Sequence, residues 1–316
     1  MYRVAVLGHQ EITKIFVDQL VKSETINLVL GLSLDPKIAI ASDHVDLKKY
    51  YVRLGCKFEY LDDYSLLNSR IEKILLAEKI DFICVVGWSR LIPAPLVEDF
   101  NFIGWHGGVY PPPRCRGRAG INWALINRHK TLYYYTMKLD SGVDTGSVLD
   151  QSHLSINEHD TVRTVYLKLG FELVALFLES FTSLTDKKGF VKSKAEEYQS
   201  YLPGRLPEDS LINWLQSDID VDHFVRALCF PYPCAYTFLE NGERFEIHSG
   251  RPLGNITGLT LKPGEVYADL IWGGVMIGCA KGIYLAENFE CETDIAHVHG
   301  SVFEKLTGKI NPTIKY

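Results

Sequence analysis

The stretch IDFICVVGWSRLIP, residues 80–93, decides the fold of this chain. Residues 82–86 are apolar and favour a strand, and they lack the alternation of apolar and polar residues that marks a half-exposed strand. A strand that is apolar on both faces is typical of a parallel sheet covered by helices. Gly87 ends the run, and a mixed polar and apolar segment leads to Pro93. We therefore predict a buried central strand whose carboxyl end carries a loop.

Strand and helix patterns alternate on both sides of this stretch. Strands are expected at residues 3–7, 26–30, 57–60, 102–106, 131–138 and 148–154, and helices at 10–22, 64–78, 119–127 and 161–178. The alternation predicts a doubly wound α/β domain with a mostly parallel, Rossmann-like sheet and ligands at the carboxyl ends of its strands. The segment GHQEIT after the first strand is not a GxGxxG motif, so dinucleotide binding is not predicted.

The composition changes after Leu184. The next segment is polar, charged and interrupted by Pro203, Gly204 and Pro207, which is typical of a linker. Beyond it, one helical segment precedes several short strand-forming runs separated by glycines. We expect a catalytic domain at 1–185, a linker at 186–205 and a smaller β-rich, OB-like domain at 206–316. The aromatic residues of this last domain are interpreted mainly as core: Trp214, Tyr232, Tyr236 and Trp272.

The overall composition is that of a globular protein. Of the 316 residues, 47% are hydrophobic and 23% are charged, and no apolar stretch is long enough to span a membrane. The seven cysteines form no CxxC pair and mostly lie in apolar runs, which favours reduced thiols in the cytoplasm. The net charge of −6 disfavours a nucleic-acid partner, because a polyanion requires clustered Lys and Arg.

The candidate catalytic residues lie between residues 87 and 151. His106 comes at the end of a predicted strand, and the glycines after it allow a ligand to approach the backbone. Asp140 and Asp144 lie in a glycine-rich turn after the next strand. A histidine and an aspartate at neighbouring strand ends suit proton transfer near neutral pH. A structural histidine and ordinary turn aspartates would give the same pattern, so spacing alone leaves both interpretations open.

Several segments resemble the formyltetrahydrofolate-dependent formyltransferases. FIGWHGGVYPPPRCRGRAGINWALI at 102–126 resembles their formyl-transfer loop, LDSGVDTGSVLDQ at 139–151 their second catalytic loop, and GWSRLIP at 87–93 their pterin-binding loop. The tail agrees independently, since RLPEDSLINW at 205–214 and the segments after it resemble the C-terminal domain of methionyl-tRNA and UDP-aminoarabinose formyltransferases. The ordered set implies a member of this family.

The resemblance implies a role for each matching residue. His106 and Asp144 match the catalytic histidine and aspartate, and 10-formyltetrahydrofolate is the implied co-substrate. The folate would be bound by Trp88, Ser89, Arg90, Leu91, Ile92, Asp140, Ser141, Gly142 and Val143. The amine substrate would be bound by Gly107, Gly108, Tyr110, Arg114, Arg116, Arg118 and Asn122. No metal is expected, and the HVHG segment with His297 and His299 is interpreted as a surface turn.

Gly104 departs from the family pattern, which has a catalytic asparagine two residues before the histidine. That asparagine donates a hydrogen bond to the oxyanion, and loss of one such donor typically costs about 10²–10³ in rate. Another donor, such as Ser89, Asn122 or a backbone N–H of Gly107 or Gly108, would take over this role. Slower transfer, transfer of another one-carbon group, and folate binding without transfer are the alternatives.

The acceptor that the resemblance implies is the amino group of a nucleotide-linked sugar, for a surface polysaccharide such as lipopolysaccharide O-antigen. Arg114, Arg116 and Arg118 would bind its pyrophosphate, because arginine pairs bidentately with phosphate oxygens, or would pack against the linker or the second domain. Methionyl-tRNA or another small amine is the alternative acceptor. The loop at 31–47 has a single lysine, which argues against tRNA. Related sugar formyltransferases often form homodimers, so a homodimer is also implied.

Overall fold

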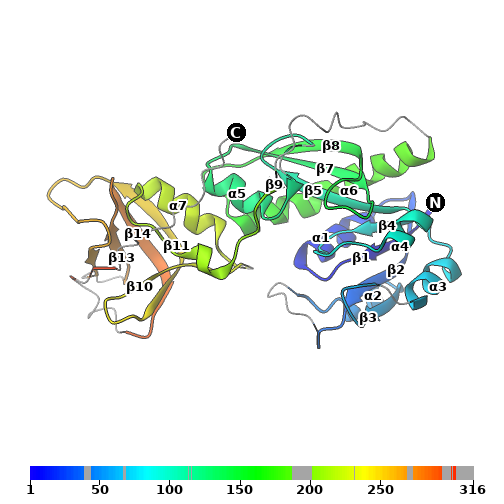
Figure 1. The fold of residues 1–316 in the computed structure, drawn as a ribbon, viewed down its shortest axis with the longest axis horizontal. Helices are drawn as coiled ribbons and strands as arrows, with labels where there is room; N and C mark the ends of the chain where they lie inside the picture. The colour runs from blue at the N-terminus through cyan, green and yellow to red at the C-terminus, as the bar shows by residue number, and fades with distance from the viewer. Residues whose placement is uncertain are drawn as a thin grey trace. The chain divides into compact units, whose positions relative to one another are not determined.

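The computed structural model describes residues 1–38, 44–66, 69–112, 114, 116–186, 201–230, 232–268, 273–293, 300 and 302–303. The chain divides into two compact units (Figure 1). The first unit comprises Met1–Gly120, Lys130–Ile156 and Thr164–Pro203, and the second comprises Ile121–His129, Asn157–Arg163 and Gly204–Tyr316.

The first unit is built on a seven-stranded sheet with the order β3-β2-β1-β4-β5-β7-β8. Its strands are β1 (Tyr2–Leu7), β2 (Ile26–Leu34), β3 (Lys57–Leu61), β4 (Phe82–Val85), β5 (Phe102–Gly108), β7 (Thr131–Lys138) and β8 (Ser147–Ser155). The strands from β3 to β5 in this order run parallel, whereas β7 and β8 are antiparallel to their neighbours. The chain moves outward from β1 to β3 and returns to β4 on the other side of β1. The structure thus confirms the doubly wound, mostly parallel sheet.

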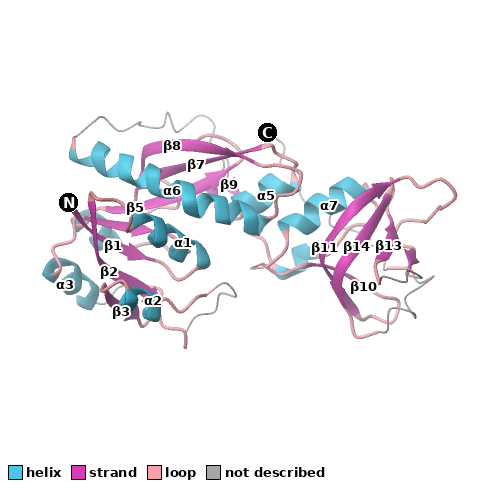
Figure 2. Ribbon diagram, turned by 180° about the vertical axis from the view of Figure 1, so that it is seen from behind, coloured by secondary structure: helices cyan, strands magenta, loops and turns pink. Residues whose placement is uncertain are grey.

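Helices cover both faces of this sheet (Figures 1 and 2). On one face lie α1 (Glu11–Leu20) and α6 (Val162–Thr185), where Phe16 packs against Phe177 with 4.9 Å between ring centroids. On the other face, α3 (Ser69–Ala77) and α4 (Ala94–Asp99) share one core with β1, β2 and β4, while α2 (Lys48–Arg53) packs beside β3. Burial on both faces explains the unbroken apolar run of β4. Among the described residues, no helix combines the length and the apolar character needed to cross a membrane.

The loops after β1 and β4 cross at close range. Thr13 Oγ1 donates to Val86 O at 2.7 Å, and His9 N donates to Gly87 O at 3.2 Å. A Cβ added to Gly8 would lie 1.8 Å from Val86 O, so a larger residue would have to displace backbone. Gly87 has φ +74°, in the left-handed region that favours glycine. These contacts fix the residues that follow β1 and β4 relative to one another.

A short parallel pair of strands lies beside this sheet. β6 (Arg116–Gly117) pairs with β9 (Tyr201–Leu202), and Arg118 N donates to Leu202 O at 3.1 Å. The composition of this region predicts only a linker, but residues 201 and 202 are held within the first unit. Two residues of strand are too short to give a periodic signal in the sequence.

The second unit contains a five-stranded antiparallel sheet with the order β10-β11-β14-β13-β12. Its strands are β10 (Ala235–Phe238), β11 (Arg244–Gly254), β12 (Val266–Tyr267), β13 (Val275–Gly278) and β14 (Ile283–Glu290). The 3₁₀ helix η1 (Pro207–Ser210) precedes α7 (Asp218–Ala227), which packs against β11 and β14. Phe303 stacks on Trp214 and lies against Phe245 in the core. The smaller β-rich domain is therefore confirmed.

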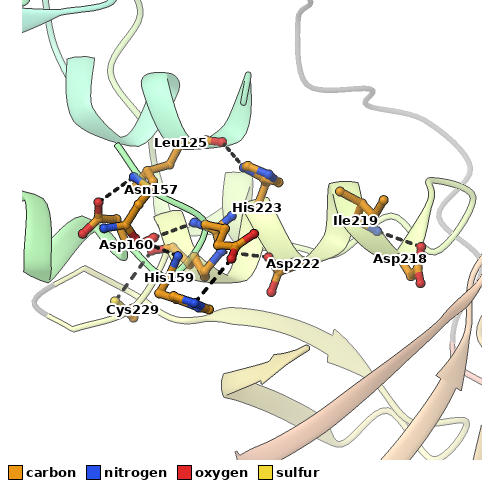
Figure 3. Close-up of polar contacts among 11 residues, drawn as sticks. Leu125, Asn157, His159, Asp160, Asp218, Ile219, Asp222, His223 and Cys229 are labelled. Atoms are coloured by element: carbon orange, nitrogen blue, oxygen red, sulfur yellow. Dashed lines mark hydrogen bonds and ion pairs between the residues drawn. The ribbon is translucent and has the colours of Figure 1, made fainter. Parts of the chain in front are cut away.

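Two segments from the middle of the chain join the second unit through α7 (Figure 3). His223 Nδ1 on α7 lies 2.8 Å from Leu125 O of α5 (Gly120–Ile126). Arg226 Nη1 donates to Asp160 O at 2.5 Å and holds the segment 157–163. A helical pattern does not indicate what a helix packs against, so the sequence assigns both segments to the first domain.

The remaining predictions about individual residues concern cysteines and aromatic rings. The six cysteines that the structure describes are free thiols. Trp214 and Tyr236 are buried, and Tyr232 is half-buried. Trp272, His297 and His299 lie outside the described residues.

Candidate functional site

The carboxyl ends of β1, β4 and β5 meet at one edge of the first unit's sheet. The strand order reverses between β1 and β4, and open α/β sheets bind ligands in the crevice at such a reversal. Leu7 pairs with Val85, and Val85 pairs with Gly104, so the segments after β1 and β4 begin level with the middle of β5, two residues before His106. Most of the predicted site residues lie in these segments and in the loop before β8.

His106 and Asp144 face each other at this edge. His106 Nδ1 lies 3.5 Å from Asp144 Oδ2, and their side chains are 11% and 20% exposed. Tyr135, opposite His106 in the β5–β7 ladder, places its ring 5.7 Å from the imidazole between centroids. The structure therefore brings together the imidazole and the carboxylate that the sequence singled out. A carboxylate in this position can orient an imidazole and stabilise its protonated form.

The backbone aims Asp144, and not Asp140, at the histidine. Asp144 has φ +51°, in the left-handed region that aspartate tolerates better than most residues. Gly117 N donates to Asp144 Oδ2 at 2.9 Å, and this is the oxygen that faces His106. Asp140 instead organises its own turn, since its Oδ1 accepts a hydrogen bond from Gly142 N at 3.0 Å.

The three predicted substrate-binding arginines have different environments. Arg116 is 4% exposed, and its Nε has no hydrogen-bond partner in the part of the chain that the structure describes. Arg114 is exposed, with its guanidinium 5.9 Å from the ring centroid of Tyr110. Arg118 is exposed, and its backbone is tied to β9. Arg116 is thus a buried guanidinium with one unpaired donor, and leaving a buried polar group unpaired is costly.

The predicted folate loops present apolar side chains at the same edge. Ile92 is buried and Trp88 is half-buried, both against the core of the unit. Leu91 on this loop is 53% exposed, and Val143 on the turn before β8 is 46% exposed. The other predicted folate residues are mainly exposed: Ser89, Arg90, Asp140 and Ser141, with Gly142 half-buried. Exposed apolar groups on two loops suit contact with a flat ring.

Leu139 occupies the space beside Gly104. A Cβ added to Gly104 would lie 2.6 Å from Leu139 Cδ2 and 3.1 Å from its Cγ. An asparagine side chain at position 104 would therefore fit only if Leu139 moved. The site has no side-chain amide at this position.

The other oxyanion donors considered from the sequence are widely distributed. Gly107 and Gly108 are buried in β5, and Ser89 is exposed after β4. Asn122 lies in the second unit, where its Nδ2 donates to Ala227 O at 2.8 Å. The amide nitrogen of Asn122 is thus used to pack α5 on α7.

His9 belongs to the segment 8–11, which the resemblance implies at the border of the folate cleft, although the sequence gives this residue no role of its own. It follows β1 and is fully buried, and neither ring nitrogen has a hydrogen-bond partner among the described residues. Burial, with a smaller contribution from His44, lowers the pKa of His9 to about 4. The burial comes from residues far along the chain, such as Tyr64 and Trp88, so no local pattern signals it.

Comparison with known families gives matches over most of the chain. The family described as Formyl transferase matches residues 2–179. The family described as Formyl transferase, C-terminal domain, matches residues 206–295. The two matched regions lie on either side of the predicted linker.

Curated relatives match mainly over part of their length. A methionyl-tRNA formyltransferase of Thermodesulfovibrio yellowstonii is 32% identical over 205 residues, which are 64% of this chain and 64% of that protein. The bifunctional polymyxin resistance protein ArnA of Wigglesworthia glossinidia brevipalpis is 30% identical over 149 residues, 47% of this chain and 22% of that protein. The chain thus spans just under two thirds of the length of the first relative.

Solved structures share the fold. HypX from Aquifex aeolicus in complex with tetrahydrofolic acid has a TM-score of 0.62 at 17% identity, covering 96% of this chain and 46% of that one. The N-formyltransferase from Helicobacter canadensis, in complex with folinic acid and dTDP-3-aminofucose, has a TM-score of 0.57 at 16% identity. The match covers 92% of this chain and 100% of that one. Because the family match at residues 2–179 covers more than half of the 316 residues, the chain belongs to the formyl transferase family.

Proposed function

We propose that this protein transfers a formyl group from 10-formyltetrahydrofolate to the amino group of a nucleotide-linked amino sugar, for a surface polysaccharide. The observation that carries the proposal is the His106–Asp144 pair, 3.5 Å apart, at the ligand-binding edge of a formyl transferase sheet. The ligands of the similar structures, tetrahydrofolic acid in one and folinic acid with dTDP-3-aminofucose in another, support both substrate classes.

His106 is the proton carrier in this reaction. The amine nitrogen attacks the formyl carbon, and the bond between that carbon and the folate nitrogen then breaks. His106 accepts the proton that the amine loses and returns it to the leaving nitrogen, so the proton balance closes without another acid. Asp144 orients the ring and stabilises the imidazolium between these two steps. With no amide at Gly104, the imidazolium also donates to the oxyanion.

The folate is received by the loop after β4 and the turn before β8. The exposed side chains of Leu91 and Val143 provide apolar contacts for the pterin. Backbone groups of residues 88–92 and 140–143 provide its hydrogen bonds. Asp140 keeps the second segment in shape through its bond from Gly142 N.

Arg116 supports an anionic acceptor. Its side chain is almost completely buried without a counter-ion in the described part of the chain, one residue before the backbone N–H that holds Asp144. A pyrophosphate would satisfy this guanidinium through charge-assisted hydrogen bonds. A nucleotide-linked sugar carries this group beside the sugar that bears the amine.

Methionyl-tRNA is the second candidate acceptor. It is favoured by the relatives with that name, which reach 32% identity. The net charge of −6 disfavours it, because binding the tRNA backbone requires a clustered basic surface.

The proposal is tested by supplying 10-formyltetrahydrofolate with UDP- and dTDP-linked amino sugars and measuring the release of tetrahydrofolate. A parallel reaction contains charged initiator tRNA. His106→Ala and Asp144→Ala should each lower turnover about 10²–10⁴-fold. His159→Ala is a matched control, because the His159 side chain is 88% exposed and belongs to the second unit. Turnover of the tRNA alone would reverse the choice of acceptor, and folate binding without turnover of any amine would refute the transferase function.

A further inference from the structure

His9 and Trp88 present unpaired hydrogen-bonding groups at the carboxyl edge of the sheet. His9 is 0% exposed with neither Nδ1 nor Nε2 bonded, and Trp88 Nε1 is buried without a partner, within the described residues. Their ring centroids are 5.6 Å apart at an interplanar angle of 84°. Buried polar groups in proteins are almost all hydrogen-bonded, so adjacent exceptions from two different loops require an explanation.

Two further rings cover His9. His44 stacks on it with 5.5 Å between centroids, and Tyr64 meets it edge-on at 6.0 Å. His44 Nε2 lies 3.2 Å from Leu34 O, which holds this ring over His9. We call the four residues His9, His44, Tyr64 and Trp88 the His9 cluster. Because the loops that carry His9 and Trp88 are locked together through Gly87 O, the unpaired groups are held in place before any ligand binds.

The His9 cluster is suited to a neutral ligand and not to a phosphate. The low pKa of His9, about 4, leaves a neutral imidazole with one donor and one acceptor at pH 7. Asp63, next to Tyr64, has its pKa lowered by hydrogen bonds from the Ser65 side chain and backbone, so it carries a negative charge. Arg90 is a cation on the outer side of Tyr64, and its guanidinium, 5.2 Å from the ring centroid, interacts with the face of that ring.

The register of the sheet brings the segments that carry His9 and His106 near each other. Leu7 and Gly104 are both aligned with Val85, so two strand spacings of about 4.8 Å put these two residues about 10 Å apart. His106 follows Gly104 within β5, and His9 follows Leu7 just beyond the end of β1. This separation accommodates one six-membered sugar ring between the reacting amine and the cluster.

We propose that the His9 imidazole and the Trp88 indole N–H bind the sugar ring of the acceptor through its hydroxyl groups, while its amino group faces His106 and the backbone of Trp88 stays with the folate. Hydroxyl groups both donate and accept, which matches the free nitrogens of a neutral imidazole and an indole N–H. The anionic part of the acceptor is left to Arg116. This inference rests on the proposed function, and it assigns sugar selectivity to residues outside the catalytic pair.

The experiment compares His9→Phe and Trp88→Phe with the unchanged protein in acceptor kinetics and thermal unfolding. Each variant keeps a ring but removes the unpaired groups, so the KM for the amino-sugar nucleotide should rise about tenfold. The melting temperature of His9→Phe should stay the same or rise, because it removes buried groups that lack partners in the free protein. His9→Gln keeps a donor and an acceptor and should recover part of the affinity. Tyr51→Phe is the matched control, since its fully buried hydroxyl is unpaired but lies under β2.

The outcomes separate the inference from the proposed function. A normal acceptor KM in both ring variants, with a lower melting temperature for His9→Phe, would mean that an ordered water pairs with His9 and would overturn the inference alone. If His9→Phe does not fold, the acceptor KM of Trp88→Phe and His9→Gln decides. Absence of turnover with any amino-sugar nucleotide in the unchanged protein would refute the proposed function, and this inference with it.

Discussion

Gly104 and Leu139 offer a sharp test of how the catalytic edge is packed. In Gly104→Ala the new methyl group would lie 2.6 Å from Leu139 Cδ2, 3.1 Å from Cγ and 3.2 Å from Cδ1. Carbon atoms prefer about 3.5–4.0 Å, so the leucine must retreat by roughly 1 Å. Overpacking of this kind costs about 1–3 kcal/mol of folding free energy. Leu139→Ala alone should cost about 2 kcal/mol, the lower end for leucine, because Leu139 is only partly buried.

The double variant should be more stable than the sum of the two changes predicts. Once Leu139 is alanine, the methyl group at position 104 has space, and about 1–3 kcal/mol of the cost disappears. The assay is urea unfolding of the four proteins of the cycle. Gly107→Ala is the control in the same strand, since its Cβ would meet Trp105 Cζ3 at an ordinary 3.4 Å. Additivity within about 0.5 kcal/mol would show that Leu139 does not fill the space beside Gly104.

The same pair connects packing to catalysis. The family's asparagine should increase turnover only where space exists, so Gly104→Asn with Leu139→Ala should be faster than Gly104→Asn alone. The gain is at most about 10²–10³, the value of one oxyanion donor. Equal rates for these two variants would mean that the imidazolium already supplies the required hydrogen bond.

Three other substitutions at the carboxyl edge of the sheet are tested by measuring folding stability. Because the folded pKa of His9, about 4, lies below its unfolded value of 6.5, the unfolded state binds the proton first, and stability falls as the pH drops from 6.5 to 4. About 2.4 kcal/mol is lost between pH 7 and pH 4.5, and His9→Phe should lose that much less in urea unfolding at these two pH values. Gly8→Ala should cost more than about 2 kcal/mol, because its Cβ would strike backbone at 1.8 Å, whereas Gly107→Ala should not. Arg116→Met should raise the melting temperature, by a gain of about 0.5–2 kcal/mol in folding free energy, and should weaken acceptor binding. A lower melting temperature would mean that the guanidinium is paired in the free protein.

Local patterns predict the strands well because burial on both faces leaves a continuous apolar run. The start of α3 shows where such patterns fail. Apolar spacing suggests a helix from Tyr64, but residues 64–66 lie outside α3, which is described over Ser69–Ala77. Asp63 Oδ1 accepts hydrogen bonds from Ser65 N and Leu66 N, and Leu66 has φ +55°, outside the helical region. A local side-chain hydrogen bond thus competes with the helix at residues 64–66.

Some features of the candidate site can likewise be predicted from local sequence, whereas others depend on the tertiary fold. His106 and Asp144 are found from strand ends, turn residues and resemblance, and their meeting at 3.5 Å follows from the β5–β7–β8 arrangement. The filling of Gly104's space by Leu139 depends on register and cannot be read from spacing. The burial of His9 depends on three rings from other segments. The sequence therefore does not predict which polar side chains the tertiary fold buries away from water.

The buried polar groups that have no hydrogen-bond partner among the described residues belong to different kinds of side chain. Tyr51 and Tyr284 have buried hydroxyls without partners, but each buries a single polar atom on a large apolar ring that contributes to the core. His9 and Arg116 are different, because an unpaired nitrogen of an imidazole or a guanidinium costs more than it gains from apolar contact, and Trp88 Nε1 lies beside His9. They come from segments that follow β1, β4 and β5, the three strands whose ends flank the reversal in strand order. These three groups would gain partners from a ligand with matching polar groups, and a sugar joined to a pyrophosphate has both kinds of group.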